Sequence, residues 1–308
     1  MKSIFNIFEQ FKSNKISKSK YIKKIHKYHQ LLFDYSKLIT STDIKKIEIT
    51  ANKVIMEFKQ NNIRIVCDPV DERDIPIEII NFGTFEGEYN TIFLLIAKQC
   101  KTFVDIGANT GWYSLNVAKV NPKNRIYSFE PISKAYDLLL ENIQINKLNN
   151  VLPMNIGLSN NVGRAIFYYH DEGPGNASLK NLSKKRKQNH ISCTLDTLDN
   201  VVKKNNIVVD LIKCDVEGNE LNVFKGAINT LTNHQPVVFA EMVRKWTKEF
   251  NYHPNEIIKL FEDCNYSCFY IKNKQINNIR VITDNTRETN FIFFHNNKHK
   301  AFISKYTK

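Results

Sequence analysis

One stretch constrains the fold of this chain more than any other: the ten residues TFVDIGANTG, Thr102–Gly111. The apolar run Thr102–Ile106 predicts a buried strand, and the glycines behind it predict a tight turn that opens a helix at Trp112. Asp105 lies at the carboxyl end of that strand, where open α/β sheets bind their ligands. A second acid, Glu130, ends the next apolar strand at about the spacing at which an acidic residue meets a ribose. The pattern predicts a site for a nucleoside-containing cofactor.

The glycine turn differs from the dinucleotide-binding motif G-x-G-x-x-G. Here Gly107 and Gly111 flank Asn109, and Asp105 precedes them. A carboxylate so close would repel a pyrophosphate, whereas it suits a cationic or hydroxylated ligand. S-adenosylmethionine carries an ammonium, a sulfonium and a ribose, and no phosphate, so the motif favours it over a dinucleotide. The alternative is a purely structural strand–turn–helix in which Asp105 caps the helix.

From about Ile77 onwards, short apolar strands alternate with helices of about 10–14 residues, which predicts an α/β fold with a mostly parallel sheet and helices on both faces. The expected strands are Thr102–Ile106, Arg125–Phe129, Val151–Asn155, Val208–Cys214, Val237–Met242, Tyr266–Ile271 and Asn290–Phe294. The expected helices are Tyr89–Lys98, Trp112–Val120, Ser133–Asn146 with Ser133 as its cap, Leu195–Lys204, Glu220–Thr232 and Asn255–Cys264. No helical pattern separates the last two strands, so we expect them to pair antiparallel.

The N-terminal residues have a different pattern. Residues 1–40 have apolar side chains at helical spacing, beginning with Ile4, Phe5, Phe8 and Phe11. Three alternating runs then predict a small β-meander: Lys46–Ile49, Lys53–Phe58 and Ile63–Cys67. Pro69 and Pro76 indicate a linker. We therefore expect an accessory segment at residues 1–76, with a basic helix and a meander, and a cofactor-binding domain at residues 77–308.

Charge and cysteine content narrow the possible partners and location. The net charge is +13, and residues 1–30 hold eight lysines and one acid; a second cluster, Lys180–Lys187, holds five basic residues. The abundance of Lys, Asn and Ile together suggests an AT-rich genome, and most such runs are solvated faces. The alternative is an anionic partner: a membrane surface, a nucleotide-sugar, a glycan carrier or a nucleic acid. Six scattered cysteines without C-x-x-C, no signal-peptide cleavage site and no long apolar span indicate a cytoplasmic protein, in contact at most with the inner face of a membrane.

Candidate reaction residues follow the fourth and fifth expected strands. In KCDVEGNE, Lys213 and Asp215 share one face of the strand, because side chains alternate. Asp215 could bind the amino group of the cofactor, act as a base or contribute to a metal site. Glu217 could border the reaction site or merely cap the next helix, and Lys213 could merely neutralise a buried carboxylate. Glu241 is a candidate base for a sugar hydroxyl, or a surface acid at a strand end.

Between the third and fourth strands, an apolar hairpin at Ala165–Tyr169 is expected, followed by a polar loop at Asp171–Asn189. Its segment Gly173–Ser178, with His170, could fold over an acceptor. Several known sites are absent from the sequence: there is no Pro-Pro-aromatic motif of exocyclic-amine methylation, no Pro-Cys pair, no P-loop, no H-E-x-x-H and no G-x-S-x-G. These absences weigh against the commonest DNA-base methylation chemistries.

Taken together, the motifs resemble those of FkbM-type S-adenosylmethionine-dependent methyltransferases. The resemblance covers about residues 82–294. The motifs that carry it are FGTFEGEY at Phe82–Tyr89, VDIGANTG at Val104–Gly111, FEP at Phe129–Pro131, TLDTL at Thr194–Leu198, IKCDVEGNE at Ile212–Glu220 and KGA at Lys225–Ala227. The family more often has an aliphatic residue in place of Cys214. The N-terminal residues, about 75, fall outside the resemblance.

The resemblance implies a class I methyltransferase (Rossmann-like) fold, with a seven-stranded sheet whose last strand is antiparallel. It also implies O-methylation of hydroxyls on sugars, glycolipids or polyketide-type products. By position, the methionine part of the cofactor would be lined by Asp105, Gly107, Asn109 and Gly111. Glu130 would hold the ribose, Asn155 and Gly157 would lie near the adenine, and Asp215 and Glu217 would border the reaction site.

We therefore expect an O-methyltransferase that acts on a sugar, glycan or glycolipid, with Asp215 or Glu241 taking the proton of the hydroxyl. A divalent metal held by Asp215 and Glu217 is possible but not favoured, because no histidine lies beside them. The rivals are an RNA or DNA methyltransferase that uses the basic segments, and a non-catalytic module that only binds the cofactor. A further hypothesis is that residues 1–30 contact an anionic membrane.

Overall fold

A central eight-stranded sheet organises the computed structural model, which describes residues 3–170, 173–182 and 189–306. Its strand order is β14-β13-β15-β12-β11-β4-β5-β6. The strands are β4 (Thr102–Ile106), β5 (Arg125–Phe129), β6 (Val151–Met154), β11 (Leu211–Cys214), β12 (Val237–Glu241), β13 (Tyr266–Lys272), β14 (Gln275–Asn278) and β15 (Asn290–His295). The five strands from β12 to β6 pair in parallel, and β15 pairs antiparallel with both of its neighbours.

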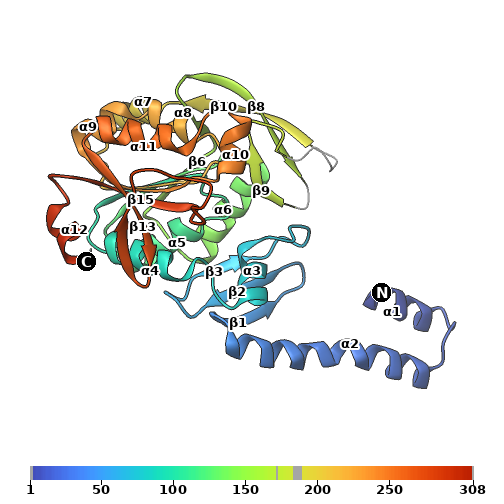
Figure 1. Cartoon of the computed structure of the whole chain (residues 1–308). Helices are drawn as coiled ribbons and strands as arrows, with labels where there is room; N and C mark the ends of the chain where they lie inside the picture. Colours follow the sequence, from blue (N-terminus) through green and yellow to red (C-terminus); the bar gives the residue numbers. More distant parts are fainter. Residues whose placement is uncertain (1–2, 171–172, 183–188, 307–308) are drawn as a thin grey trace.

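Helices cover both faces of this sheet (Figure 1). One face carries α4 (Gly87–Ala97), α5 (Trp112–Val120) and α6 (Ser133–Ile145). The other carries α7 (Leu198–Asn205), α8 (Glu220–Lys225), α9 (Ile228–His234) and α11 (Pro254–Asp263). The short helices α10 (Arg244–Glu249) and α12 (Lys300–Tyr306) complete this domain. Because the parallel strands are covered on both sides, β11 is buried along its whole length, as are the last four residues of β4 and β5.

The structure confirms the expected α/β class and the antiparallel last strand. All seven expected strands belong to the sheet, and β14 adds an eighth at its edge. The bounds predicted for β4, α5 and β5 agree with those observed.

Three helix predictions need correction. Residue Ser133 does not cap α6: the N-cap is Ile132, and no side chain bonds there. Leu195 belongs to a strand, and α7 begins at Leu198, where the Thr197 side chain accepts from the amide of Asn200. The expected helix Glu220–Thr232 is two helices, because α8 ends before Gly226, where a Cβ would lie 2.1 Å from the carbonyl oxygen of Ser159.

A second sheet, in the order β7-β10-β8-β9, follows β6. It consists of β7 (Gly157–Leu158), β8 (Gly163–His170), β9 (Gly173–Ser178) and β10 (Asn189–Asp196). The expected polar loop therefore contains a strand, β9, which pairs with β8. The side chain of His170, residues 171–172 and most of the basic cluster Lys180–Lys187 lie outside the described part of the chain.

The N-terminal segment forms a small antiparallel sheet and a projecting arm. The sheet, β1 (Ile44–Ile49), β2 (Val54–Phe58) and β3 (Arg64–Val66), is the expected meander. It is fastened to α6, where Asn142 and Asn146 accept hydrogen bonds from the amides of Val66 and Arg64, each at 2.9 Å. The linker after it is partly helical, since α3 (Ile75–Phe82) includes Pro76 in its first turn.

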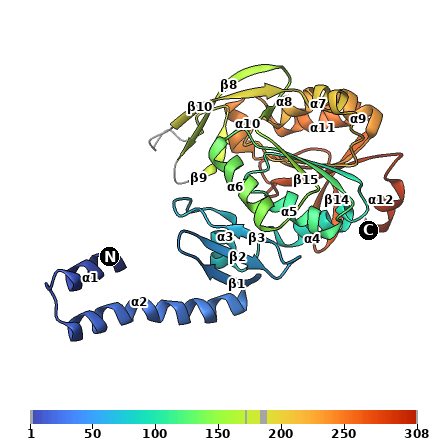
Figure 2. The same ribbon diagram turned by 180° about the vertical axis from the view of Figure 1, so that it is seen from behind.

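The arm, residues 3–38, consists of α1 (Ile4–Lys12) and α2 (Lys18–Leu38), and the short 3-10 helix η1 (Ile39–Ser41) connects it to the meander. As Figures 1 and 2 show, α2 leads away from the meander and α1 folds back beside its far end. Among the described residues, no helix combines the length and the apolar character needed to cross a bilayer. The domain boundary at residue 76 stays a prediction.

Candidate functional site

The turn after β4 brings two loops of the sheet into backbone contact. Gly107 has a φ of 78° and Gly111 a φ of 97°, both in the left-handed region that favours glycine. A Cβ on Gly107 would lie 1.8 Å from the carbonyl oxygen of Asp215. Asn109 also has a positive φ, 48°. Because Gly107 has no side chain, the carboxyl ends of β4 and β11 can approach each other closely.

Asp105, at the end of β4, anchors the helix that follows. It is 2% exposed, and its Oδ2 accepts from the Ser114 hydroxyl at 2.6 Å and the Ser114 amide at 3.1 Å. Burial, only partly offset by these bonds, raises the pKa of Asp105 to about 6. Both bonds end on Oδ2 and hold the first turn of α5. Asp105 therefore does stabilise the start of this helix, as in the structural alternative, but it uses only one of its two carboxylate oxygens to do so.

Glu130, after β5, ties the turn to the start of α6. Its Oε2 accepts from the amide of Asn109 and its Oε1 from the amide of Ile132, both at 2.9 Å. Burial raises the pKa of Glu130 to about 7. Asn155 donates from Nδ2 to the carbonyl oxygen of Glu130 at 2.8 Å, so it holds the end of β5 in place.

Beside these residues is a small apolar hollow of about 20 Å³. It is lined by Ile106, Gly107, Phe129, Pro131, Ile156, Gly157, Leu158, Phe167, Val216 and Asn219. A Cβ on Gly157 would lie 2.8 Å from a methyl carbon of Leu195, so a side chain there would clash with the second sheet. Gly157 thus lines this cavity, and the expected position of Asn155 and Gly157 near the adenine stays a prediction.

A buried cation lies at the centre of the second group of acids. Lys213 is 1% exposed; its Nζ is 3.3 Å from Asp215 Oδ2 and 5.1 Å from the ring centroid of Tyr113. Burial opposes its charge, but the surrounding Asp215, Glu86, Tyr89 and Glu241 raise the pKa of Lys213 well above its ordinary value. Lys213 and Asp215 do share one side of the strand end, as expected.

The two strand ends hold Asp215 and Glu241 close enough to influence each other. Repulsion by Asp215 and then burial raise the pKa of Glu241 to about 10. Glu241 is therefore not the simple surface acid that was one of its two expected roles. The two candidate bases differ in their partners: Asp215 forms the ion pair with Lys213, whereas repulsion by Asp215 favours the protonated form of Glu241.

Glu217 belongs to the same group, but it does not cap α8. Its backbone is left-handed, with a φ of 52°, and burial followed by repulsion from Asp215 raises its pKa to about 8. Glu220 occupies the start of α8 instead and accepts from the amides of Val216 and Gly218 at 3.2 and 3.0 Å. Tyr252 donates to the other oxygen of Glu220 at 3.1 Å. Within the described residues, no group of three or more His, Cys, Asp or Glu forms a metal-ligand set.

Two residues that precede β4 also belong to the site, although no role is expected for them from the sequence. Glu86, with a φ of 50°, directs charge at Lys213 and Asp215, and its Oε2 is buried without a hydrogen-bond partner in the described structure. Tyr89 packs its ring against Phe239 of β12, with centroids 5.1 Å apart. Both lie in the motif Phe82–Tyr89, which is the part of the sequence that indicates them.

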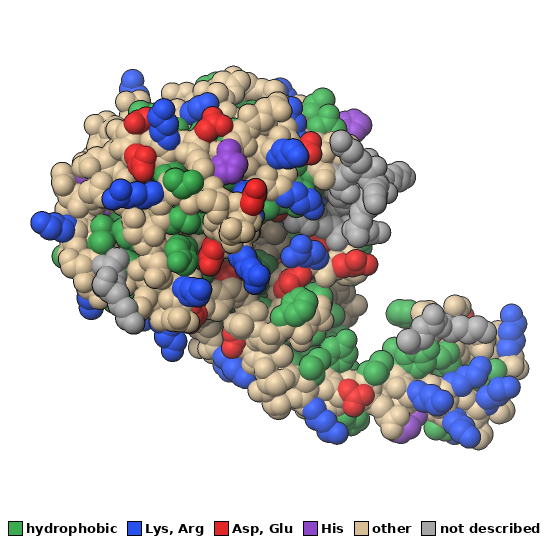
Figure 3. Space-filling view, in the orientation of Figure 1, with side chains coloured by type: hydrophobic (Ala, Val, Ile, Leu, Met, Phe, Trp, Pro, Cys, Tyr) green, Lys and Arg blue, Asp and Glu red, His purple; other side chains and the backbone are tan. Residues whose placement is uncertain are grey.

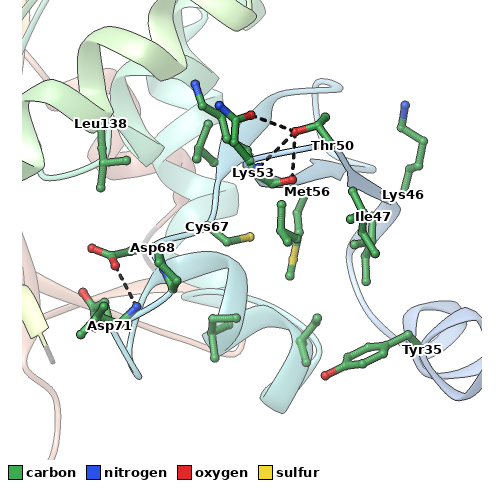
Figure 4. A pocket seen from close by; sticks show the side chains of 18 of the residues that line it. Tyr35, Lys46, Ile47, Thr50, Lys53, Met56, Cys67, Asp68, Asp71 and Leu138 are labelled. Carbon is green, nitrogen blue, oxygen red and sulfur yellow. Dashed lines mark hydrogen bonds between the residues drawn. The ribbon is translucent and has the colours of Figure 1, made fainter. Parts of the chain in front are cut away.

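A much larger cavity, which we call the groove, lies elsewhere, at the base of the arm (Figure 4). It has a volume of about 1270 Å³ and lies between α2, the meander, α3 and α6. Tyr35 borders one end and Asp68 and Asp71 the other, with Met56 and Cys67 pointing into it. At that end, the Asp71 carboxylate accepts a hydrogen bond from the amide of Arg73 at 2.8 Å.

Comparison with known proteins identifies the core of the chain. The model of the Methyltransferase FkbM domain matches residues 105–268, from the acid that ends β4 to β13. The chain belongs to the FkbM methyltransferase family. The matched residues, 105–268, include every predicted site residue. Glu86 and the whole N-terminal segment lie outside this range.

Three curated relatives share between 26% and 30% of their residues with this chain. Methyltransferase sdnD of Sordaria araneosa is 30% identical over 46% of this chain and 65% of its own length. Hexuronic acid methyltransferase AglP of Haloferax volcanii is 27% identical over 50% and 62%. A tRNA(Phe) (4-demethylwyosine(37)-C(7)) aminocarboxypropyltransferase of Methanocaldococcus jannaschii is 26% identical over 38% and 51%. The matches thus span between about half and two-thirds of the length of these relatives.

Proposed function

We propose that this protein transfers a methyl group from S-adenosylmethionine to a hydroxyl of a sugar, glycan or glycolipid. The observation that carries the proposal is the cluster at the ends of β11 and β12, where the half-buried acids Asp215, Glu217 and Glu241 lie around the buried Lys213 next to the turn after β4. Acids whose pKa values are shifted by burial and by one another are typical of sites that move a proton. Family membership makes methyl transfer the reaction class to expect.

The residues at the turn fit the donor. The carboxylates of Asp105 and Glu130 match an ammonium and a ribose, and the close backbone approach at Gly107 leaves no room for a side chain. Several polar atoms around the turn are buried without a hydrogen-bond partner in the described structure: Thr110 Oγ1, Trp112 Nε1, Tyr113 Oη and Glu86 Oε2. When bound, S-adenosylmethionine supplies an electrophilic methyl group on a sulfonium.

In this proposal, the chain's own residues orient the acceptor and take its proton. An alkyl hydroxyl is weakly acidic, so a carboxylate must accept the proton as the new bond forms. Asp215 is the better placed of the two candidates, because it pairs with Lys213, whereas repulsion and burial raise the pKa of Glu241. Lys213 holds the Asp215 carboxylate in place through their ion pair. Glu217, at the same edge, is proposed to accept a hydrogen bond from the acceptor.

The acceptor class is supported by one relative and opposed by another. AglP is named for a hexuronic acid, which supports a sugar acceptor. The aminocarboxypropyltransferase is named for a tRNA, and the arm of this chain is basic. We favour the sugar because a carboxylate such as Asp215 suits removal of the proton from a sugar hydroxyl. A tRNA acceptor would instead predict binding that weakens steeply with salt.

A labelled-methyl transfer screen over uronic acids, neutral glycans and tRNA tests the proposal. We expect label in the sugars, and a loss of about 10²–10⁴-fold in rate for Asp215→Asn, with donor affinity little changed. The matched control is Asp263→Asn, an exposed acid at the end of α11. Label in tRNA alone, or full activity of Asp215→Asn, would contradict the assignment.

A further inference from the structure

The N-terminal arm is an ordered hairpin. Ile7 of α1 and Ile25 of α2 are buried, and the rings of Phe11 and Tyr21 stack with centroids 4.5 Å apart. Ser3 and Ser17 cap the two helices with their side chains. The arm therefore presents a defined surface to its surroundings.

That surface exposes large apolar side chains on both helices. Phe5 is 79% exposed and Phe33 is 69% exposed. The other exposed apolar residues of the arm are Ile4, Phe8, Ile22, Leu31, Leu32, Tyr35 and Leu38. An apolar surface of this extent is unfavourable in water and marks a surface that binds a partner.

The same arm is strongly basic. Between Ser3 and Gln30 it carries Lys12, Lys15, Lys18, Lys20, Lys23, Lys24 and Lys27, against the single acid Glu9. In the described part of the chain, the ion pairs begin at Lys45, and none includes a lysine of the arm. Figure 3 shows these lysines gathered at the far end of the arm, with apolar side chains between them and the body. The charge is therefore available to a partner.

We propose that the arm, residues 3–38, binds the surface of a bilayer that contains anionic lipids. Exposed Phe and Ile side chains would enter the region between headgroups and acyl chains, and the lysines would remain among the phosphates. The charge decides between a bilayer and a second copy of this chain. Two arms would bring their lysines together and repel each other, whereas an anionic surface complements them.

The position of the arm connects this surface to the rest of the molecule. Leu32 and Tyr35 of α2 are among the exposed apolar residues of the arm, and both also line the groove at its base. The apolar surface of the arm thus continues into the groove, whose other end is lined by Asp68 and Asp71.

Co-sedimentation of the full chain with vesicles tests the proposal. The vesicles contain phosphatidylcholine alone or phosphatidylcholine with phosphatidylglycerol. We expect binding to the anionic vesicles only, reduced by about 100-fold in the quadruple variant Lys20→Gln, Lys23→Gln, Lys24→Gln and Lys27→Gln, because each lysine near the surface contributes several-fold. The matched control replaces four exposed lysines of the body by Gln: Lys203, Lys204, Lys259 and Lys272. It should bind as the unchanged chain does.

A second variant, Phe5→Ser with Phe33→Ser, tests the apolar part. Both side chains are exposed, so folding should be unaffected. We expect at least a tenfold loss of vesicle binding. Equal binding to both vesicle types, unchanged binding of the lysine variant, or a dimer that only the Phe variant dissociates would overturn the proposal. Calorimetry with S-adenosylmethionine on the same samples keeps the two proposals separate, since donor binding does not depend on the arm.

Discussion

The methyltransferase domain and the arm depart from ordinary burial in opposite ways. At the edge of the central sheet, a lysine and several acids are buried, although charges normally stay in water. In the arm, large apolar side chains such as Phe5 are exposed, although they normally lie inside. Each departure is unfavourable for the stability of the chain by itself. We therefore interpret both regions as functional: the buried charges belong to a reaction site, and the exposed apolar side chains belong to a binding surface.

The largest expected effect comes from removing the buried cation. Lys213→Met leaves the carboxylates of the site without their partner, so we expect a loss of about 3–5 kcal/mol in the free energy of unfolding at neutral pH. Urea denaturation measures it, with Lys259→Met as the exposed control. A loss below about 1 kcal/mol would mean that the acids are solvated and the comparison with the arm fails.

The next effect tests the backbone contact at the turn. Gly107→Ala would place a Cβ against the carbonyl of Asp215 at a φ of 78°, so we expect a loss of stability of about 2–4 kcal/mol together with loss of donor binding. Gly163→Ala is the control, because Gly163 also has a positive φ but nothing lies within 4 Å of its Cβ position. Equal losses in the two variants would assign the effect to backbone strain alone.

A smaller effect concerns pH. Burial raises the pKa of Glu130 from 4.5 to about 7, so the folded state keeps a proton that the unfolded chain has lost. The free energy of unfolding should therefore fall as pH rises from about 4.5 to about 7, and Glu130→Gln should reduce this fall by about 1–2 kcal/mol. Urea titrations at pH 5 and pH 7 measure it, with Glu262→Gln as the exposed control. Identical pH slopes in all three proteins would contradict the burial of Glu130.

The smallest effect sharpens the contrast with the arm. Replacing Lys20, Lys23, Lys24 and Lys27 by Gln should change the free energy of unfolding by less than about 0.5 kcal/mol, because no ion pair among the described residues includes them. A larger loss would show that the lysines stabilise the hairpin and are not held for a partner.

The parts of the fold that depend on local pattern could be predicted from the sequence. The bounds of β4 and β5 were found because a strand covered on both faces is a continuous apolar run. The break between α8 and α9 was missed, because it depends on the close approach of Ser159 to Gly226, which local helical spacing does not contain. The bonds of Glu220 to the turn before α8 could not be predicted either, because they depend on the left-handed backbone of Glu217 and Gly218.

In the candidate site, too, some residues follow from local motifs and others depend on tertiary packing. Asp105, Glu130 and Asp215 follow strands with strong motifs, so their shared edge could be expected. Glu86 comes from a segment more than 100 residues before Asp215, and only the packing of α4 brings the two together. The high pKa of Glu241 likewise arises from a neighbour on another strand, so sequence alone could not separate the two candidate bases.

Calorimetric titration of the full chain with S-adenosylmethionine, and separately with NAD, tests the central claim most directly. The claim is that the carboxylates ending β4 and β5 form the site of a cationic adenosyl donor. We expect saturable binding of S-adenosylmethionine at one site, none of NAD, and loss of binding in Asp105→Ala that remains folded by circular dichroism. No heat with S-adenosylmethionine, or saturable binding of NAD, would contradict the account.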